Sequence, residues 1–397
     1  MSAVLRDARQ VRFAALPPLA LYVHLPWCVK KCPYCDFNSH EMGRNAQGAL
    51  GDLPFAEYVA ALIRDLEAIL PSVWGRRLSS IFMGGGTPSL FPAEQIDVLL
   101  SSIRARLPLE PDAEITMEAN PGASEAGRFR GYRDAGVNRL SVGVQSFDDA
   151  MLKALGRIHS ADEARRAIVM ALDTFGNINI DLMYGLPGQT LAMARADIDA
   201  GVRMGTQHFS AYQLTIEPNT VFHSQPPTLP GHDAAADMQA MAEEALAVAG
   251  FEHYETSAFA KPGRRCRHNL NYWEFGDYAG IGAGAHGKLS FADRVTRHER
   301  VKQPREYLAA SGDVEQRVIA AKELPFEFML NALRLVNGFP AELFAVRCGL
   351  PPSLIESALR AAVEQGMIER DLQRIRPTDR GRRFLNDLVA LFLPAQK

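Results

Sequence analysis

Three cysteines near the N-terminus have a type and spacing that could do chemistry. Cys28, Cys32 and Cys35 fall within eight residues in a C-x3-C-x2-C pattern, in a predicted loop just after the first predicted strand. Three close thiolates suit an iron–sulfur cluster in which the protein binds three of four irons and leaves the fourth open to a small molecule. A structural zinc site is the alternative, because His24 or His40 could complete a tetrahedron.

A glycine run follows the second predicted strand. Gly84, Gly85 and Gly86 precede Thr87, so the backbone there could approach a ligand closely while the threonine hydroxyl makes a hydrogen bond. A plain tight turn explains such a run equally well.

Polar residues also lie at or just beyond the ends of otherwise apolar predicted strands. Glu118, Gln145 and Asp181 have this position, and Arg157 lies between two such strands. A polar residue that ends an apolar strand is costly unless it serves a ligand or caps the next helix. The carboxyl ends of the strands are therefore the expected site.

The cysteine pattern, with Tyr34 before its last member, resembles the signature of radical S-adenosylmethionine (SAM) enzymes. In that family the open iron of a 4Fe-4S cluster chelates the methionine of SAM, and one electron from the cluster cleaves SAM to a 5′-deoxyadenosyl radical. The resemblance implies a cluster on the three cysteines and an electron donor that reduces it. The implied SAM-binding residues are Tyr22, Tyr34, Gly85, Gly86, Thr87, Glu118, Gln145, Arg157 and Asp181.

Within that superfamily almost the whole chain, including its C-terminal domain, resembles the subfamily of oxygen-independent coproporphyrinogen III oxidases and HemW haem chaperones. The oxidases carry a fourth cysteine two residues after the third, where this chain has Phe37, and a longer arm than the 21 residues before Tyr22. The stretch from His268 to Trp273 reads His-Asn-x-x-Tyr-Trp and is similar to the motif of the HemW family. We therefore expect a haem chaperone, with oxidative decarboxylation of porphyrinogen propionates as the alternative function. Whether the chain cleaves SAM stays open.

The same segment offers groups for haem. His268 could bind the iron, and Tyr272 and Trp273 could lie against the porphyrin. Cations that could pair the propionates are Lys261, Arg264, Arg265 and Arg267. Other candidates for the iron ligand are Cys266, His253, His286 and His24. An ordinary basic loop leading into an aromatic core contact explains the segment as well.

Short apolar runs alternate with helical patterns through the first two thirds of the chain, which predicts an α/β fold with a parallel sheet. The predicted strands are 19–25, 79–83, 113–118, 138–144, 177–183 and 207–214. The predicted helices are 54–70, 93–106, 124–135, 161–175, 190–204 and 233–249. Six βα units favour a partial (βα)6 barrel, with a doubly wound sheet as the alternative.

The chain divides into three predicted parts, namely the radical SAM partial barrel over 1–250, a connector over 251–320, and a C-terminal domain over 321–397. No clean period can be read in the connector. In the last part, helices over 326–336, 352–365 and 379–393 with a hairpin over 367–375 predict a winged-helix-like α+β arrangement. Its arginines raise DNA binding as a weaker hypothesis, and they are Arg370, Arg374, Arg376, Arg380, Arg382 and Arg383.

Composition narrows the class of protein. With 47% hydrophobic residues and a net charge of -3, the chain is expected to be globular, and nucleic acid is not expected as a partner. It has no apolar run of membrane-spanning length, and Cys266 and Cys348 stand alone, so neither a transmembrane segment nor a disulfide framework is expected. The expected partners are haem and apo-haemoproteins such as membrane respiratory enzymes. The expected location is the cytoplasm, with a peripheral position at the inner membrane left open.

Overall fold

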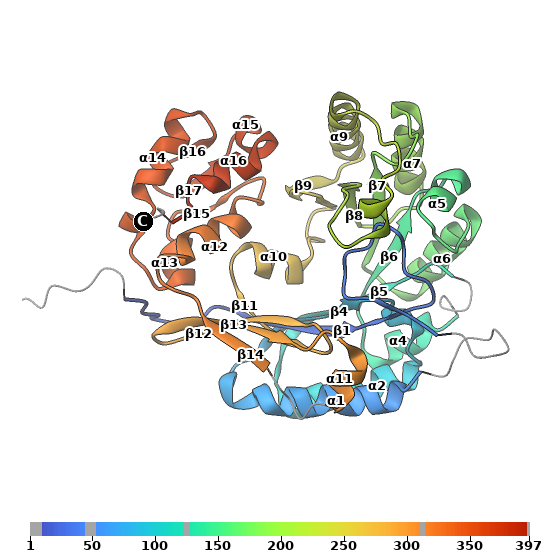
Figure 1. The fold of residues 1–397 in the computed structure, drawn as a ribbon, viewed down its shortest axis with the longest axis horizontal. Helices are drawn as coiled ribbons and strands as arrows, with labels where there is room; N and C mark the ends of the chain where they lie inside the picture. The colour runs from blue at the N-terminus through green and yellow to red at the C-terminus, as the bar shows by residue number, and fades with distance from the viewer. Residues whose placement is uncertain (1–9, 44–52, 123–126, 310–313, 395–397) are drawn as a thin grey trace, which may run out of the picture.

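A twelve-stranded sheet organises the molecule. The computed structural model describes residues 10–43, 53–122, 127–309 and 314–394. The sheet has the order β14-β13-β12-β11-β1-β4-β5-β6-β7-β8-β10-β9, and neighbouring strands from β11 to β8 run parallel. Figure 1 shows the sheet curving around an inner space, with helices on its outer side.

The six predicted βα units are confirmed. Their strands are β1 (Leu19–Leu25), β4 (Leu78–Gly85), β5 (Leu109–Ala119), β6 (Arg139–Gln145), β7 (Ile178–Tyr184) and β8 (His208–Gln213). Their helices are α1 (Phe55–Ile69), α2 (Ala93–Arg106), α4 (Phe129–Ala135), α6 (Ala161–Thr174), α7 (Leu191–Arg203) and α9 (His232–Val248). The start of the predicted helix 124–135 lies outside the described residues.

Short elements in the loops were not expected. Two short helices, α5 (Asp149–Ala154) and α8 (Val221–Ser224), and two short strands, β2 (Trp27–Cys28) and β3 (His40–Glu41), join the larger units. The Asp148 side chain accepts hydrogen bonds from the first turn of α5 and fixes its start. A capping box of Ser160 and Glu163 fixes the start of α6, and the Arg157 amide donates to the Leu152 carbonyl of α5 at 2.9 Å, so the turn that carries Arg157 is held at both ends.

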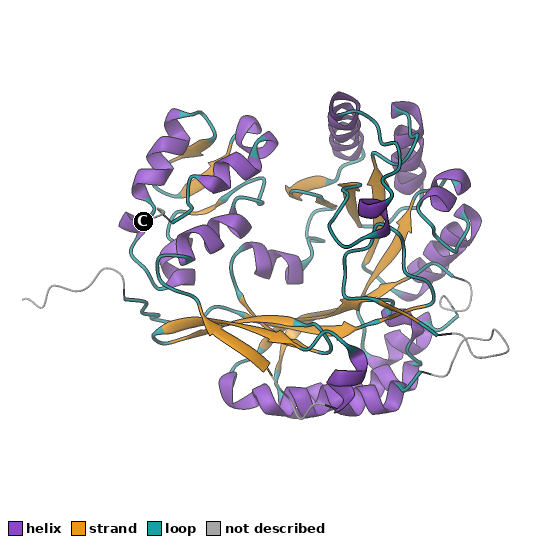
Figure 2. Ribbon diagram, viewed as in Figure 1, coloured by secondary structure: helices purple, strands orange, loops and turns teal. Residues whose placement is uncertain are grey.

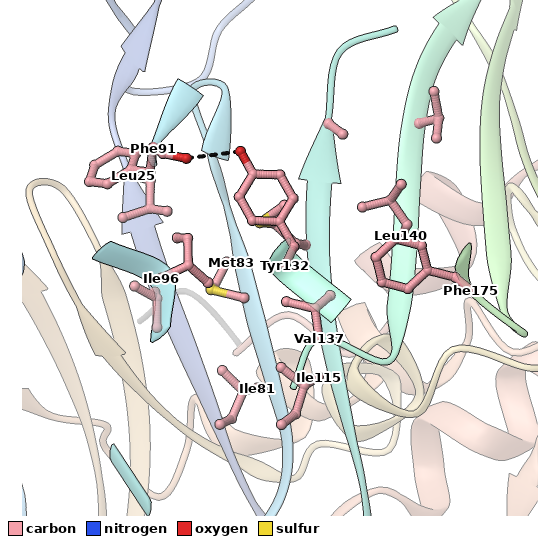
Figure 3. Close-up of a cluster of buried hydrophobic side chains, with 14 of the residues drawn as sticks. Leu25, Ile81, Met83, Phe91, Ile96, Ile115, Tyr132, Val137, Leu140 and Phe175 are labelled. Carbon is pink, nitrogen blue, oxygen red and sulfur yellow. Dashed lines mark hydrogen bonds between the residues drawn. The ribbon is translucent and has the colours of Figure 1, made fainter. Parts of the chain in front are cut away.

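The core between the sheet and its helices holds the parallel strands in place. Figure 3 shows Ile81, Met83 and Ile115 of the central strands packed with Ile96 and other apolar side chains, all nearly inaccessible to solvent. Burying each such side chain contributes about 1.5–3 kcal/mol. The Tyr132 hydroxyl in this core donates to the carbonyl of Phe91 at 2.8 Å, so its one polar atom is paired.

The segment 251–320 is not the irregular connector that we expected, because its strands extend the main sheet at both edges. It contains β9 (Glu252–Glu255), β10 (Ala258–Ala260), β11 (Asp277–Ile281), β12 (His286–Phe291), β13 (Arg294–Arg300) and β14 (Val314–Val318), with α10 (Arg267–Trp273) and α11 (Pro304–Ala309). Polar side chains occupy the interior here and hide the usual alternation: Lys288 and Asp277 form a buried ion pair at 2.9 Å, and Arg300 pairs with Asp65 at 2.6 Å.

The C-terminal part combines helices with a small three-stranded sheet, as Figure 2 shows. Its elements are α12 (Leu324–Ala332), β15 (Phe339–Pro340), α13 (Leu343–Cys348), α14 (Glu356–Glu364), β16 (Ile368–Arg370), β17 (Arg374–Pro377), α15 (Asp379–Arg383) and α16 (Leu385–Ala390). The predicted final helix 379–393 is wrong as one helix, because Phe384 leaves the helical conformation between α15 and α16. Helix α13 and strand β15 were missed, and the first predicted helix ends earlier, at Ala332.

In the part of the chain that the structure describes, no helix is both long and apolar enough to cross a membrane.

Candidate metal and cofactor site

The predicted cluster and SAM residues meet in one cavity at the carboxyl ends of the central strands. This inner cavity has a volume of about 280 Å³. Its lining includes every one of those residues except Tyr22, namely Cys28, Cys32, Cys35, Tyr34, Gly85, Gly86, Thr87, Glu118, Gln145, Arg157 and Asp181. Residues from six segments of the sequence therefore face one space, as expected for the ends of parallel strands.

A hydrogen-bonded chain joins two of the three thiols. The Thr87 hydroxyl donates to Cys28 Sγ at 3.4 Å, and Asn120 Nδ2 donates to the Thr87 hydroxyl at 3.0 Å. Arg157 continues the chain, because its Nη2 donates to Asn120 Oδ1 at 2.6 Å and its Nη1 to Cys32 Sγ at 3.6 Å. Hydrogen bonds to ligand sulfurs orient the cysteines and tune the properties of a bound cluster. This hydrogen-bond network is therefore what a cluster-binding loop requires.

The surroundings of Cys28 and Cys35 disfavour their deprotonated forms when no metal is bound. Burial raises the pKa of the Cys28 thiol to about 11, although the hydrogen bond from Thr87 acts in the opposite direction. Cys35 also has a raised pKa from burial, and its Sγ lies 3.5 Å from the Ser39 hydroxyl. A bound metal supplies the positive charge that stabilises thiolates in such surroundings.

The glycine run allows two backbone segments to pack closely against each other. A Cβ on Gly86 would lie 2.6 Å from the backbone of Pro26, and one on Gly85, whose φ is +110°, would lie 2.3 Å from the His24 ring. The run therefore lets β4 pack directly against the start of the cysteine loop. The amide of Gly85 still donates to Glu118 Oε2 at 3.2 Å and so positions a carboxylate of the inner cavity.

Two carboxyl groups of the inner cavity are held away from bulk water. Burial, with a contribution from the nearby Asp181 charge, raises the pKa of Glu118 to about 8. Burial also raises the pKa of Asp181, against hydrogen bonds from Asn179 and other neighbours. Perturbed carboxyls in a concave site are typical of ligand-binding positions, and a cationic ligand group would favour their ionised forms.

The zinc alternative is not supported by the positions of its histidines. The Nδ1 of His24 lies 3.0 Å from the Tyr22 hydroxyl and its Nε2 lies 2.9 Å from the Asn38 carbonyl oxygen, so both ring nitrogens have partners. His40 Nε2 lies 3.2 Å from Asn38 Oδ1. Tyr22, which contacts His24, does not line the inner cavity but a second cavity that also includes Gly85.

Sequence reasoning missed several residues of the inner cavity. Asn120, Ser141, Gly143, Ser210 and Tyr212 also line it, and the Tyr212 hydroxyl donates to Gln145 Oε1 at 2.8 Å. The signal was a period of two: Ser141, Gly143 and Gln145 alternate on β6, as do Ser210 and Tyr212 on β8. Alternate residues of a strand face the same side of its sheet.

Comparisons with known proteins agree with this geometry. Residues 22–200 match the family model of the radical SAM superfamily, and residues 319–384 match that of the HemN C-terminal domain. The chain is 48% identical to "Heme chaperone HemW" of Escherichia coli over 95% of this chain and 99% of that protein. It is 47% identical to the protein of the same name from Haemophilus influenzae and 33% identical to that from Bacillus subtilis, at similar coverage. The chain belongs to the HemW family.

The fold is shared more widely than the HemW family. The solved structure of coproporphyrinogen III oxidase (HemN) from Escherichia coli has a TM-score of 0.77 and covers 95% of this chain and 90% of its own. At 22% sequence identity, this likeness shows a common fold alone.

The HemW-like motif lies in helix α10, and its residues His268 and Trp273 pack against other parts of the protein. His268 is 1% exposed, its Nδ1 lies 2.9 Å from the Ser80 hydroxyl, and its ring stacks on Phe82. Burial and the Arg139 charge lower the pKa of His268 to about 3, so the ring is neutral. Trp273 lies beneath the Arg334 guanidinium at 4.6 Å and packs against the C-terminal core. Tyr272, in contrast, lines a second cavity.

The side chains of three of the four cations expected to pair haem propionates have partners in the protein. Lys261 donates to the Ala249 carbonyl, Arg265 pairs with Glu252 at 3.0 Å, and Arg267 pairs with Glu110 at 3.1 Å. Their role towards haem stays a prediction, and in this structure they hold α10 and its flanking loop to the sheet.

Three of the six arginines singled out in the C-terminal part pair with carboxylates, and Arg374 donates to the backbone carbonyls of Asn337 and Gly338. Arg370 pairs with Glu356 at 2.7 Å, Arg376 with Glu369 at 2.6 Å and Arg382 with Asp379 at 2.8 Å. Such exposed pairs contribute little stability, but they reduce the positive field that a polyanion would need.

Proposed function

We propose that this chain is a haem chaperone that binds haem and delivers it to apo-haemoproteins. The observation that carries the proposal is the 48% identity to a heme chaperone over nearly the full length of both chains. Because the match covers the barrel, the inner cavity and the C-terminal part together, it bears on the whole function and not on the fold alone. The expected acceptors include membrane respiratory enzymes.

The inner cavity would hold the cofactors of the radical SAM superfamily, a 4Fe-4S cluster and SAM. Cys28, Cys32 and Cys35 would bind three irons, since they line the cavity together. When bound, the cluster would supply one electron to SAM and bind it through the open iron. An electron donor would be a further partner.

The residues of this chain would position these cofactors. Thr87 and Arg157 donate to two of the cysteine sulfurs, so they would orient the ligands. The Glu118 and Asp181 carboxyls would accept hydrogen bonds from the polar groups of SAM, and Tyr34 and Gln145 would complete the walls. Glu118 and Asp181 are buried, so hydrogen bonds to these two carboxyls would be strengthened.

Oxidative decarboxylation of coproporphyrinogen III is the competing function. Phe37 stands where the oxidases have a fourth cysteine, and its ring is 59% exposed at the mouth of the inner cavity. This departure argues against oxidase chemistry, which demands that a propionate be held within a fraction of an ångström of the reacting centre.

A paired assay tests the proposal. Reconstituted protein is titrated with haem and followed by its Soret band, and a separate sample is incubated with coproporphyrinogen III, SAM and a reductant. We expect a saturable Soret shift, transfer of haem to an apo b-type cytochrome faster than to apomyoglobin, and no protoporphyrinogen. Product formation without haem binding would overturn the proposal in favour of the oxidase.

A further inference from the structure

A second and larger cavity adjoins the inner one. This outer cavity has a volume of about 640 Å³, within the range of small-molecule sites, and it shares Phe37, Gly85 and Glu118 with the lining of the inner cavity. It lies where the cysteine loop, the ends of β1 and β4, helix α10 and the turn between β11 and β12 meet. Any molecule in it would lie beside the cluster loop.

The walls of the outer cavity are aromatic. Tyr22, Tyr272 and Tyr278 line it, and the rings of Tyr272 and Tyr278 lie 4.3 Å apart. Phe37 adds an exposed ring from the cysteine loop. Tyr278 is only 9% exposed and its ring is tilted by 59° to that of Tyr272, so a large planar macrocycle would lie along this aromatic wall and cover the exposed Phe37 side chain.

The rim of the outer cavity carries an accessible imidazole and two ammonium groups. His286 begins β12 with its side chain 59% exposed, and Lys302 is 67% exposed. Their pairs with Glu299, at 3.7 and 3.3 Å, are open to solvent and therefore weak. Lys31 donates to the carbonyls of Phe37 and Ser39.

The charges of the outer cavity favour an anionic ligand group at one side. Lys31 and Lys302 are cationic, and Asp36 on the exposed side and Glu118 on the inner side are the carboxyls of the lining. Because burial raises the pKa of Glu118 to about 8, that group carries little charge at neutral pH. Within the lining the two lysines thus face one charged carboxylate, Asp36, while Glu299 lies outside the lining and pairs with Lys302 in a solvent-exposed contact.

A contact between distant segments holds the walls together. Asn38, from the cysteine loop, donates through Nδ2 to the carbonyl of Ala283 at 2.9 Å and to that of Lys302 at 2.8 Å. A Cβ on Gly284 would lie 2.3 Å from this amide, so the turn packs tightly on the loop. The cysteine loop therefore fixes the position of the turn that leads to His286.

We propose that the outer cavity is the haem site, with the porphyrin against Tyr272, Tyr278 and Phe37 and the His286 imidazole as exchangeable ligand to the iron. Lys31 and Lys302 pair the propionates. This inference rests on the proposed haem-chaperone function and assigns the ligand to His286 instead of the buried His268. An exposed imidazole suits a carrier, because an acceptor protein can reach and displace it, whereas His268 does not line the cavity.

The test measures haem affinity of the cluster-loaded full chain by Soret titration. His286→Ala is expected to weaken binding about tenfold or more and to change the Soret maximum, since an iron–ligand bond is lost. His232→Ala is the matched control, because His232 is also exposed but begins α9, away from the cavity. A charge-reversed Lys302→Glu variant is expected to weaken haem binding several-fold and to leave binding of an esterified haem lacking free propionates unchanged.

The outcomes separate the two proposals. Absence of haem binding by the unaltered protein would overturn both. Haem binding that is unchanged in His286→Ala and Lys302→Glu would overturn the outer-cavity site and leave the chaperone function standing. If a correctly folded His268→Gln variant is the only one to lose the Soret shift, the iron ligand is His268 on α10 and not His286.

Discussion

The strand ends around the inner cavity and the motif on helix α10 were both predicted from the sequence as ligand sites. In the structure the residues of the first converge, and those of the second do not. Around the inner cavity, residues from separate strands face one space. On α10, the motif residues separate: His268 enters the core, Trp273 packs towards the C-terminal part, and Tyr272 lines the outer cavity.

The difference lies in the geometry of the two elements. Carboxyl ends of parallel strands meet at one edge of a sheet, so polar residues at those ends converge whatever their separation in sequence. A helix turns by 100° per residue, so neighbours such as Tyr272 and Trp273 point to different faces. A polar strand end thus predicts a site more reliably than a motif on a single short helix. Changes at the inner cavity should affect the cofactors, and changes at the packed residues His268 and Trp273 of α10 should affect stability.

The largest effect is expected from the cysteine loop. Cys32→Ala should reduce the iron of anaerobically reconstituted protein from about four per chain to less than about one, because the cluster loses one of its three protein ligands. Iron and sulfide analysis with the charge-transfer absorbance measures this. Cys266→Ala is the control, since Cys266 is buried beside Glu114 and is absent from the cavity lining. A full cluster in Cys32→Ala would break the assignment of the inner cavity.

The next effect concerns Trp273, which we assign to packing. Trp273→Ala should lower the free energy of unfolding by about 2 kcal/mol, because it removes the ring under Arg334 and its contacts with the C-terminal core. Urea unfolding monitored by circular dichroism measures the change. Trp74→Ala, at a residue that is 84% exposed, should stay within about 0.5 kcal/mol of the parent. Equal stability of the two variants would instead favour a direct ligand role for Trp273.

A smaller effect is expected at Arg157. Arg157→Ala removes hydrogen bonds to Cys32, Asn120 and the Gly143 carbonyl, and such charged hydrogen bonds contribute about 1.5–3 kcal/mol each. Because Arg157 also lines the inner cavity and holds Asn120 beside Thr87, SAM affinity should fall about tenfold in protein that still holds its cluster, as measured by the shift of the reduced-cluster paramagnetic resonance signal. Arg166→Ala, on the exposed face of α6, should bind SAM as the parent does.

The last effect is a pH dependence at Glu118, which is seen only where this carboxyl changes its charge. Because its pKa is raised from 4.5 to about 8 in the folded protein, the unfolded chain binds fewer protons between these values, and stability falls as pH rises through this window. Glu118→Gln removes this titration. Compared with the parent, the cofactor-free variant should gain stability from pH 5 to pH 8 and show no relative gain below pH 4. A constant difference across chemical unfolding curves at these pH values would contradict a buried, protonated Glu118.

The sequence by itself determined the six βα units, the cysteine loop and most of the inner cavity. These depend on local patterns: apolar runs form strands, amphipathic repeats form helices, and polar residues at strand ends face the same edge. The cofactor class followed from the spacing of Cys28, Cys32 and Cys35. The period of two on β6 and β8 would have added Ser141 and Tyr212 to the site.

Only the tertiary structure decided what lies beside that cavity. The strands over 251–320 escaped sequence analysis because charged residues such as Lys288 and Arg300 fill interior positions, where their partners Asp277 and Asp65 come from other elements. The join between Asn38 and the turn before His286 links residues about 245 positions apart. Burial also separated His268 from His286, since two histidines that look alike in sequence differ in solvent access only once the surrounding elements pack. Pairings of this kind depend on long-range contacts, which no local pattern specifies.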